Sequence, residues 1–119
     1  MQVERVDFVS FLTQDIERAK EFYAGTLGLE IESEGDSDME FRLGQVTLDV
    51  FDPSSIGDPF APTLAGFALR VPDVDAARAE LESKGVQFDG ETIVTDVCKQ
   101  AWFRDPDGNR LMLHRRFDA

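Results

Sequence analysis

The strongest constraint in this 119-residue sequence is that its two halves follow the same plan. Each half starts with an apolar segment, continues with an aspartate that opens a helical pattern, and reaches a glycine where that pattern stops. The aspartates are Asp15 and Asp73, and the glycines are Gly28 and Gly85. A repeat of about 60 residues is too long for a solenoid unit and indicates a duplicated supersecondary unit.

Within each half, the periodicity predicts one strand, one helix and three short strands. In the first half the β-branched and aromatic run 6–12 predicts a strand, and an apolar stripe at helical spacing follows Asp15. Gly44-Gln45 predicts a hairpin between two later strands. In the second half, short strands are predicted at 86–88 and 93–97. We therefore predict an α+β fold of two βαβββ modules, which form a curled mixed sheet with a concave cleft and helices on the outer face.

The composition shift between the halves predicts where the modules begin and end. Residues 53–63 hold a cluster of proline, glycine and hydroxyl side chains, which is typical of a linker. We predict a single domain, 1–119, in which module one spans 2–52 and module two spans 64–117.

Charge and cysteine content limit the partners and the location. The chain carries 24 acidic and 12 basic residues, for a formal net charge of −12. Such a surface repels phosphate, so we expect neither nucleic acid nor a membrane surface as a partner. The single cysteine, Cys98, excludes an internal disulfide and fits a reducing compartment. With no signal-like or membrane-spanning segment, we expect a cytoplasmic protein.

Three stretches carry a family resemblance, namely 8–29, 66–86 and 103–113. The last of them contains the turn Asp105-Pro106-Asp107-Gly108-Asn109 before a terminal strand. Together they resemble the vicinal oxygen chelate superfamily, which includes glyoxalase I, extradiol dioxygenases, fosfomycin-modifying enzymes and bleomycin-resistance proteins. This resemblance implies the fold described above, but the fold hosts several chemistries and also pure binding proteins.

In the catalytic members, the resemblance implies a divalent metal held by side chains from four strands. One ligand is a histidine seven residues before the helix-opening aspartate, where this chain has Phe8 and Gly66. The other is a glutamate or histidine four residues after the turn glycine, where it has Leu48 and Met112. None of these residues can bind a transition metal, so we predict no metal and no cofactor.

A displaced metal site would need other donors. Asp49, Cys98 and His114 are the candidates near the predicted cleft. Strand alternation predicts that Asp49 lies on the face opposite Leu48 and points away from the cleft. One histidine and one cysteine do not make a three-ligand site.

The same alternation predicts a largely apolar cleft with a few polar groups, as in small-ligand pockets. A closed core would have the same composition, and Trp102 either stacks on a planar ligand or closes the end of the sheet. The predicted lining consists of Phe8, Ser10, Leu12, Leu48, Val50, Trp102, Arg110, Met112 and His114.

Candidate catalytic groups are His114, Cys98 and Arg110. Cys98 becomes a nucleophile if Lys99 or His114 stabilises its thiolate, and is otherwise a buried, inert cysteine. Asp15 and Asp73 fit helix N-caps rather than a pair of catalytic acids.

The sequence thus favours a metal-free small-molecule-binding protein of the glyoxalase/bleomycin-resistance type. It would bind a small apolar or aromatic ligand for sequestration or sensing. Bleomycin-resistance proteins bind a planar, cationic drug and are usually dimers, so the resemblance also implies a homodimer. The alternative is a glyoxalase-like lyase or dioxygenase-type enzyme with a displaced or absent metal site. A third possibility is an interaction module whose concave sheet packs on a protein partner.

Overall fold

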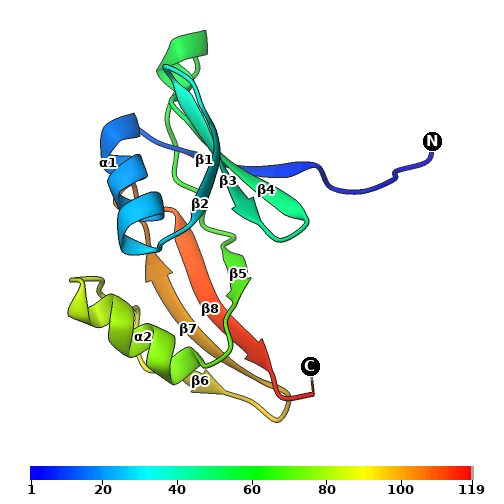
Figure 1. The fold of residues 1–119 in the computed structure, drawn as a ribbon, viewed down its shortest axis with the longest axis vertical. Coiled ribbons are helices and arrows are strands. Elements are labelled where there is room, and N and C mark those ends of the chain that lie inside the picture. The colour runs from blue at the N-terminus through cyan, green and yellow to red at the C-terminus, as the bar shows by residue number, and fades with distance from the viewer. Residues whose placement is uncertain (119) are drawn as a thin grey trace. The chain divides into compact units, whose positions relative to one another are not determined.

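The computed structural model describes residues 1–118, and the chain divides into two compact units, Met1–Pro62 and a second unit that begins at Thr63. Each unit contains one four-stranded mixed sheet with helical turns against one of its faces (Figure 1). The predicted α+β fold of two βαβββ modules is therefore confirmed. No helix in residues 1–118 is both long enough and apolar enough to cross a membrane.

The first unit is built as the sequence pattern predicts. Its elements are β1 (Phe8–Leu12), α1 (Ile16–Lys20), the π-helical continuation η1 (Glu21–Thr26), β2 (Glu30–Glu34), β3 (Asp38–Leu43), β4 (Val46–Phe51) and the short 3-10 helix η2 (Pro53–Ile56). The strand order is β1-β4-β3-β2, with β1 parallel to β4 and the other pairs antiparallel. The predicted hairpin at Gly44-Gln45 is confirmed, because β3 ends and β4 begins on either side of it.

The core of the first unit lies between its helix and one face of its sheet. The Tyr23 ring from η1 packs 5.5 Å from the Phe41 ring of β3 and 6.4 Å from the Phe11 ring of β1, measured between centroids. Leu48 and Val50 of β4 are fully buried on the same face. The helix begins as predicted at Asp15, whose carboxylate accepts a hydrogen bond from the Arg18 backbone N–H at 3.1 Å.

The second unit repeats the strand arrangement of the first. Its elements are β5 (Phe67–Arg70), α2 (Val74–Ser83), β6 (Ile93–Val94), β7 (Cys98–Arg104) and β8 (Arg110–Arg116), in the sheet order β5-β8-β7-β6. The prediction of a strand at 86–88 is wrong, since only an isolated bridge joins Phe88 to Phe103. Gly85 and Gly90 flank this segment with φ angles of +92° and +76°, and these left-handed turns bend the chain out of line with a strand.

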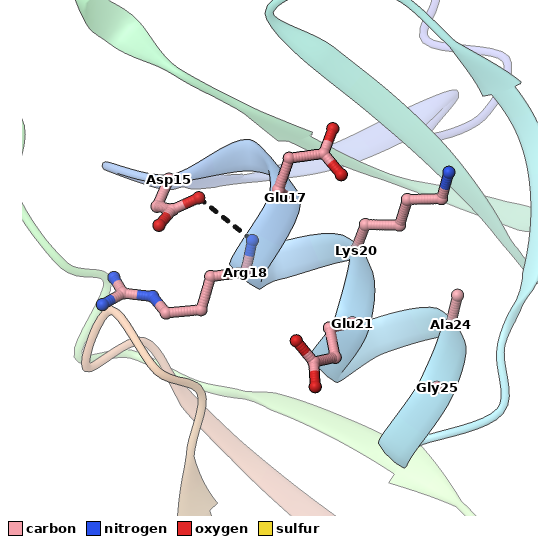
Figure 2. A pocket seen from close by; sticks show the side chains of 7 residues that line it. All are labelled: Asp15, Glu17, Arg18, Lys20, Glu21, Ala24 and Gly25. Atoms are coloured by element: carbon pink, nitrogen blue, oxygen red, sulfur yellow. Dashed lines mark hydrogen bonds between the residues drawn. The ribbon is translucent and has the colours of Figure 1, made fainter.

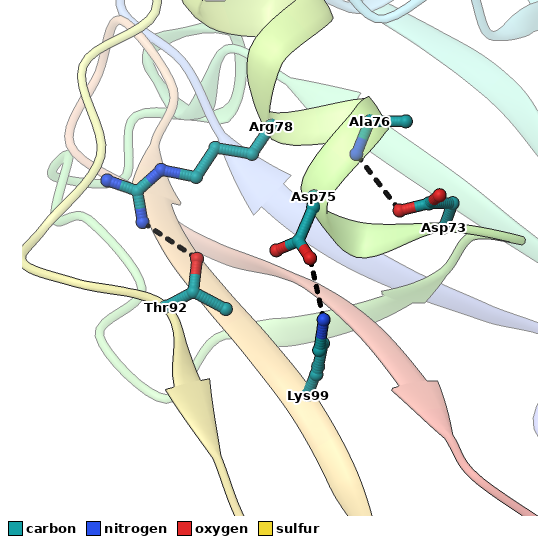
Figure 3. Close-up of polar contacts among 6 residues, drawn as sticks. All are labelled: Asp73, Asp75, Ala76, Arg78, Thr92 and Lys99. Atoms are coloured by element: carbon teal, nitrogen blue, oxygen red, sulfur yellow. Dashed lines mark hydrogen bonds and ion pairs between the residues drawn. The ribbon is translucent and has the colours of Figure 1, made fainter.

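Polar contacts hold α2 against one face of its sheet (Figure 3). Asp73 caps the helix by accepting a hydrogen bond from the Ala76 backbone N–H at 3.0 Å, which confirms its predicted role. Asp75 pairs with the Lys99 ammonium of β7 at 2.6 Å, and Arg78 donates to the Thr92 hydroxyl at 3.1 Å. The hydrogen bond and charge of Asp75 raise the pKa of Lys99. In each unit we call the sheet face opposite the helix the open face.

Candidate functional site

Strand register decides which side chains share the open face of the second unit. Residues directly opposite each other on paired strands point to the same face. Ala68, Met112 and Trp102 form one such row across β5, β8 and β7, and Arg70, His114 and Gln100 form the next row. Arg110 is two residues from Met112 on the same strand and thus belongs to this face. The structure therefore brings together Trp102, Arg110, Met112 and His114.

Trp102 lies at the centre of this face and is held in a fixed position. The Arg110 guanidinium lies over its ring, 4.3 Å from the centroid, and the indole N–H donates to the Gln100 side-chain oxygen at 3.2 Å. A Cβ added at Gly66 would lie 2.8 Å from Cζ3 of the ring. A side chain at position 66 would therefore require the Trp102 ring to shift.

Cys98 does not have the surroundings that an activated thiol needs. It is buried, and its sulfur contacts the Thr95 hydroxyl at 3.5 Å and the Gln100 amide nitrogen at 3.6 Å. Lys99 follows it on the strand, so its side chain points to the other face, where it binds Asp75. The hypothesis that Lys99 stabilises a Cys98 thiolate is therefore wrong. Within residues 1–118, no hydrogen bond joins Cys98 to His114 either.

The open face of the first unit differs from the prediction at β4. Ser10 is paired with Asp49, and its hydroxyl donates to the Asp49 carboxylate at 3.3 Å. Asp49 thus shares the face of Phe8 and Ser10, so the prediction that it points away from the cleft is wrong. Leu48 and Val50 are instead fully buried in the core, so the prediction that they line the cleft is wrong.

The error has a simple cause in the turns. We counted four residues from the turn glycine in both modules, which assumes that both closing strands start at the same distance from that glycine. The connection between β3 and β4 is a two-residue turn, whereas β8 follows the longer loop after Arg104. A difference of one residue moves every side chain to the opposite face.

Asp49 belongs to a cluster of three carboxylates on this open face. One carboxylate oxygen each from Asp38, Glu40 and Asp49 lie within 4.8 Å of one another. Burial raises the pKa of Asp49, the negative charges of Asp38 and Glu40 raise it further, and the hydrogen bond from Ser10 opposes them. Oxygen donors of this kind suit Mg²⁺, Mn²⁺ or Ca²⁺, but three partly exposed carboxylates on one sheet do not by themselves make a metal site.

The surface depressions described here lie on the helical layers. One is formed by the solvent-facing side of α1 and η1, and Figure 2 shows its charged side chains around the Asp15 cap. The other lies beyond the end of α2, between Glu82 and Phe88. Neither contains a residue that we predicted for the cleft, and neither brings together groups with a chemical role beyond solvation and capping.

The sequence was then compared with known families. Residues 5–113 match the model of the Glyoxalase/Bleomycin resistance protein/Dioxygenase superfamily. The chain belongs to this superfamily. The predicted resemblance is thereby confirmed over nearly the whole length of the chain.

The relatives of this chain share its fold more closely than they share its sequence. An uncharacterized protein of Escherichia coli (strain K12), YaeR, is 31% identical, and the match covers 96% of this chain and 98% of YaeR. The structure of TnmS3, an antibiotic binding protein from Streptomyces sp. CB03234, is 31% identical with a TM-score of 0.80 and 98% coverage of both chains. A lactoylglutathione lyase from Agrobacterium tumefaciens shares the fold at 19% identity, with a TM-score of 0.78 and coverage of 96% and 95%.

The corrected register reassigns one of the four positions at which the superfamily's enzymes hold their metal. Phe8 and Gly66 are equivalent, and two residues further Ser10 faces Asp49 while Ala68 faces Met112. Asp49, not Leu48, is therefore the counterpart of Met112. The four positions hold Phe8, Asp49, Gly66 and Met112, so one of them carries a donor.

These residues do not fit the superfamily's metal. One carboxylate falls short of the three protein ligands of a catalytic site. In addition, a histidine at position 66 would have to adopt a positive φ and displace the Trp102 ring, which lies 2.8 Å from an added Cβ. The metal of the enzymes therefore has no counterpart at these positions.

Proposed function

We propose that this protein binds a small apolar or aromatic ligand on the open face of the second unit without using a metal. The observation that carries the proposal is the fixed, half-buried ring of Trp102, with the thioether of Met112 in the same row. Aromatic and thioether side chains with a few polar groups around them are the usual lining of small-ligand sites.

Several features support a binding role. Arg110 and Gln100 hold Trp102 in place before any ligand arrives, which lowers the entropic cost of binding. TnmS3, a protein of the same fold at 31% identity, is an antibiotic binding protein. We propose sequestration or sensing as the use of such binding, in a cytoplasmic homodimer.

The test uses Trp102, which is the single tryptophan of the chain, as its reporter. Titration with the neutral aromatic probe 2-naphthamide should quench its fluorescence to saturation, and calorimetry should give the same dissociation constant. Trp102→Leu should weaken binding by about tenfold in calorimetry, because it removes an aromatic pair.

Phe117→Leu is the matched control, since it removes an exposed aromatic ring that lies outside the strands. It should bind the probe as the unchanged protein does. Equal affinity of the Trp102→Leu variant and the unchanged protein would contradict the proposal.

The alternative is a lyase or dioxygenase-type enzyme with a displaced metal site. The observation that favours it is the carboxylate cluster of Asp38, Glu40 and Asp49 in the first unit. This alternative requires a divalent metal that binds the cluster and stabilises the protein.

A further inference from the structure

The charged side chains on the strands of the second unit all have one sign. Its four strands contain no aspartate or glutamate, although the whole chain carries a net charge of −12. The register places basic side chains on the open face at both ends of the Trp102 row. They are Arg70, Arg104, Arg110 and Arg116, and the imidazole of His114 lies on the same face.

Most of these cations lack an acidic partner. Arg104 is the exception, because it pairs with Asp89 at 3.1 Å. Within residues 1–118, Arg70, Arg110 and Arg116 form no ion pair, even though acidic residues outnumber basic ones two to one. Arg70 and Arg116 are exposed, whereas Arg110 is half-buried. A half-buried arginine attracts anions because the low-dielectric surface screens its charge less than bulk water does.

Arg110 also has a side-chain N–H group without a hydrogen-bond acceptor. Its Nε is buried and has no hydrogen-bond partner within the described chain, while Nη1 makes one long contact to the Leu64 carbonyl at 3.4 Å. A buried N–H without an acceptor costs free energy, which a ligand oxygen can recover after a small shift of the side chain. The planar guanidinium matches a carboxylate through two parallel hydrogen bonds.

The apolar and the cationic groups are arranged in successive rows. Met112 and Trp102 form the middle row, Arg110 lies on one side of it, and Arg70 with His114 lies on the other. A flat ring placed over the middle row therefore has a cation within reach at either end.

We infer that the ligand is a planar aromatic anion, such as an aromatic carboxylate, whose ring packs on Trp102 and Met112 and whose negative group binds Arg110. This inference rests on the proposed function and specifies its ligand. It differs from the planar, cationic drug that the family resemblance implied, because the strands contribute no carboxylate to this face and Asp89 is already paired with Arg104.

The test compares three probes that share one ring system. They are 2-naphthoate, its neutral isostere 2-naphthamide and the cation 2-naphthyltrimethylammonium, measured by calorimetry near neutral pH. We expect 2-naphthoate to bind at least tenfold more tightly than 2-naphthamide, and the cation to bind most weakly. Arg110→Gln should bring 2-naphthoate to within about threefold of 2-naphthamide, because the charge-assisted hydrogen bonds are lost.

Arg115→Gln is the matched control for the loss of one positive charge. Arg115 is on the same strand but faces the helix side, opposite Lys99, and it too forms no ion pair within residues 1–118. It should keep the preference for 2-naphthoate. Arg70→Gln, at the other end of the Trp102 row, should lower that preference less than Arg110→Gln does.

The outcomes separate this inference from the proposed function. If all three probes bind equally, or the cation binds best, the anion preference is wrong while small-molecule binding stands. If none of them binds, the proposed function is wrong and the inference falls with it. If none binds and Arg110→Gln converts a dimer into a monomer, the face is an interface between copies, which also overturns the inference.

Discussion

At the residue scale, Gly66 and Trp102 show how this chain differs from the superfamily's enzymes at one metal-ligand position. The position seven residues before Asp73 holds a histidine in the superfamily's enzymes and a glycine here. The Trp102 ring covers this glycine, and its φ of +77° is a backbone conformation that other residues rarely adopt. The Trp102 ring thus packs against the position at which the enzymes carry a metal ligand.

Changing Gly66→Ala should therefore disturb the platform. The added Cβ would meet Cζ3 of Trp102 at 2.8 Å and would have to adopt a positive φ. We expect a loss of about 1–3 kcal/mol in the free energy of unfolding, together with a shifted Trp102 emission. Urea denaturation and the emission spectrum measure the two effects.

The control for this change is Gly25→Ala in η1, where an added Cβ meets nothing within 4 Å and φ is not positive. It should be neutral or slightly stabilising, because alanine favours helix more than glycine does. Equal effects of the two substitutions would contradict the close packing of Trp102 on Gly66.

Asp49 gives a second prediction at this scale, which concerns pH. Its raised pKa means that the folded protein binds this proton more tightly than the unfolded chain does. The contribution of Asp49 to stability is thus complete below its unfolded pKa and is lost as the pH rises through its folded pKa. At neutral pH the charged carboxylate of Asp49 lowers the free energy of unfolding.

Asp49→Asn should accordingly raise the free energy of unfolding at neutral pH. The gain should stay below about 1 kcal/mol, because the group is partly exposed and solvent screens its charge. It should disappear at about pH 3, where Asp49 of the unchanged protein is protonated. Urea denaturation at both pH values measures this. Asp58→Asn, in an exposed loop, is the control, and a gain at neutral pH that persists in acid would contradict the prediction.

At the scale of elements, the sequence is a good guide where a signal is local. Asp15 and Asp73 cap the two helices as predicted, and Gly44-Gln45 forms the hairpin. Each of these depends on contacts within a few residues, so periodicity and turn chemistry suffice. The strand predicted at 86–88 does not form, because the left-handed turns at Gly85 and Gly90 leave room for only a single bridge between Phe88 and Phe103.

The candidate site was predictable only in the second unit, and register is the reason. Trp102, Arg110, Met112 and His114 share a face because alternation along two long paired strands holds without interruption. In the first unit, an error of one residue after the tight turn exchanged Leu48 for Asp49. The cation–π contact of Arg110 and the cover of Trp102 over Gly66 had no sequence signal, since they join residues that are not neighbours along the chain.

The whole molecule distributes its charge unevenly between its units. The first unit carries fourteen acidic and four basic residues, and the second carries ten and eight. The net charge of −12 thus belongs mainly to the first unit, whose open face holds the carboxylate cluster. The net charge of the chain therefore does not predict the charge of a ligand for the second unit, because the strands of that unit present basic side chains on its open face.

Metal dependence separates a metal-free binding protein from an enzyme with a displaced metal site, and it belongs to the molecule as a whole. Chelator-treated protein should show no rise in melting temperature above about 1 °C with nickel, zinc, manganese, cobalt or ferrous iron. A metal at 100 times its dissociation constant would add about 2.7 kcal/mol and raise the melting temperature by roughly 10 °C, so binding would be plain to see. A rise that Asp49→Asn abolishes would instead place a metal on the carboxylate cluster, because that variant removes one of its three oxygen donors. That result would favour the enzyme over the binding protein, whereas a rise that persists in the variant would place the metal elsewhere and would equally contradict metal independence.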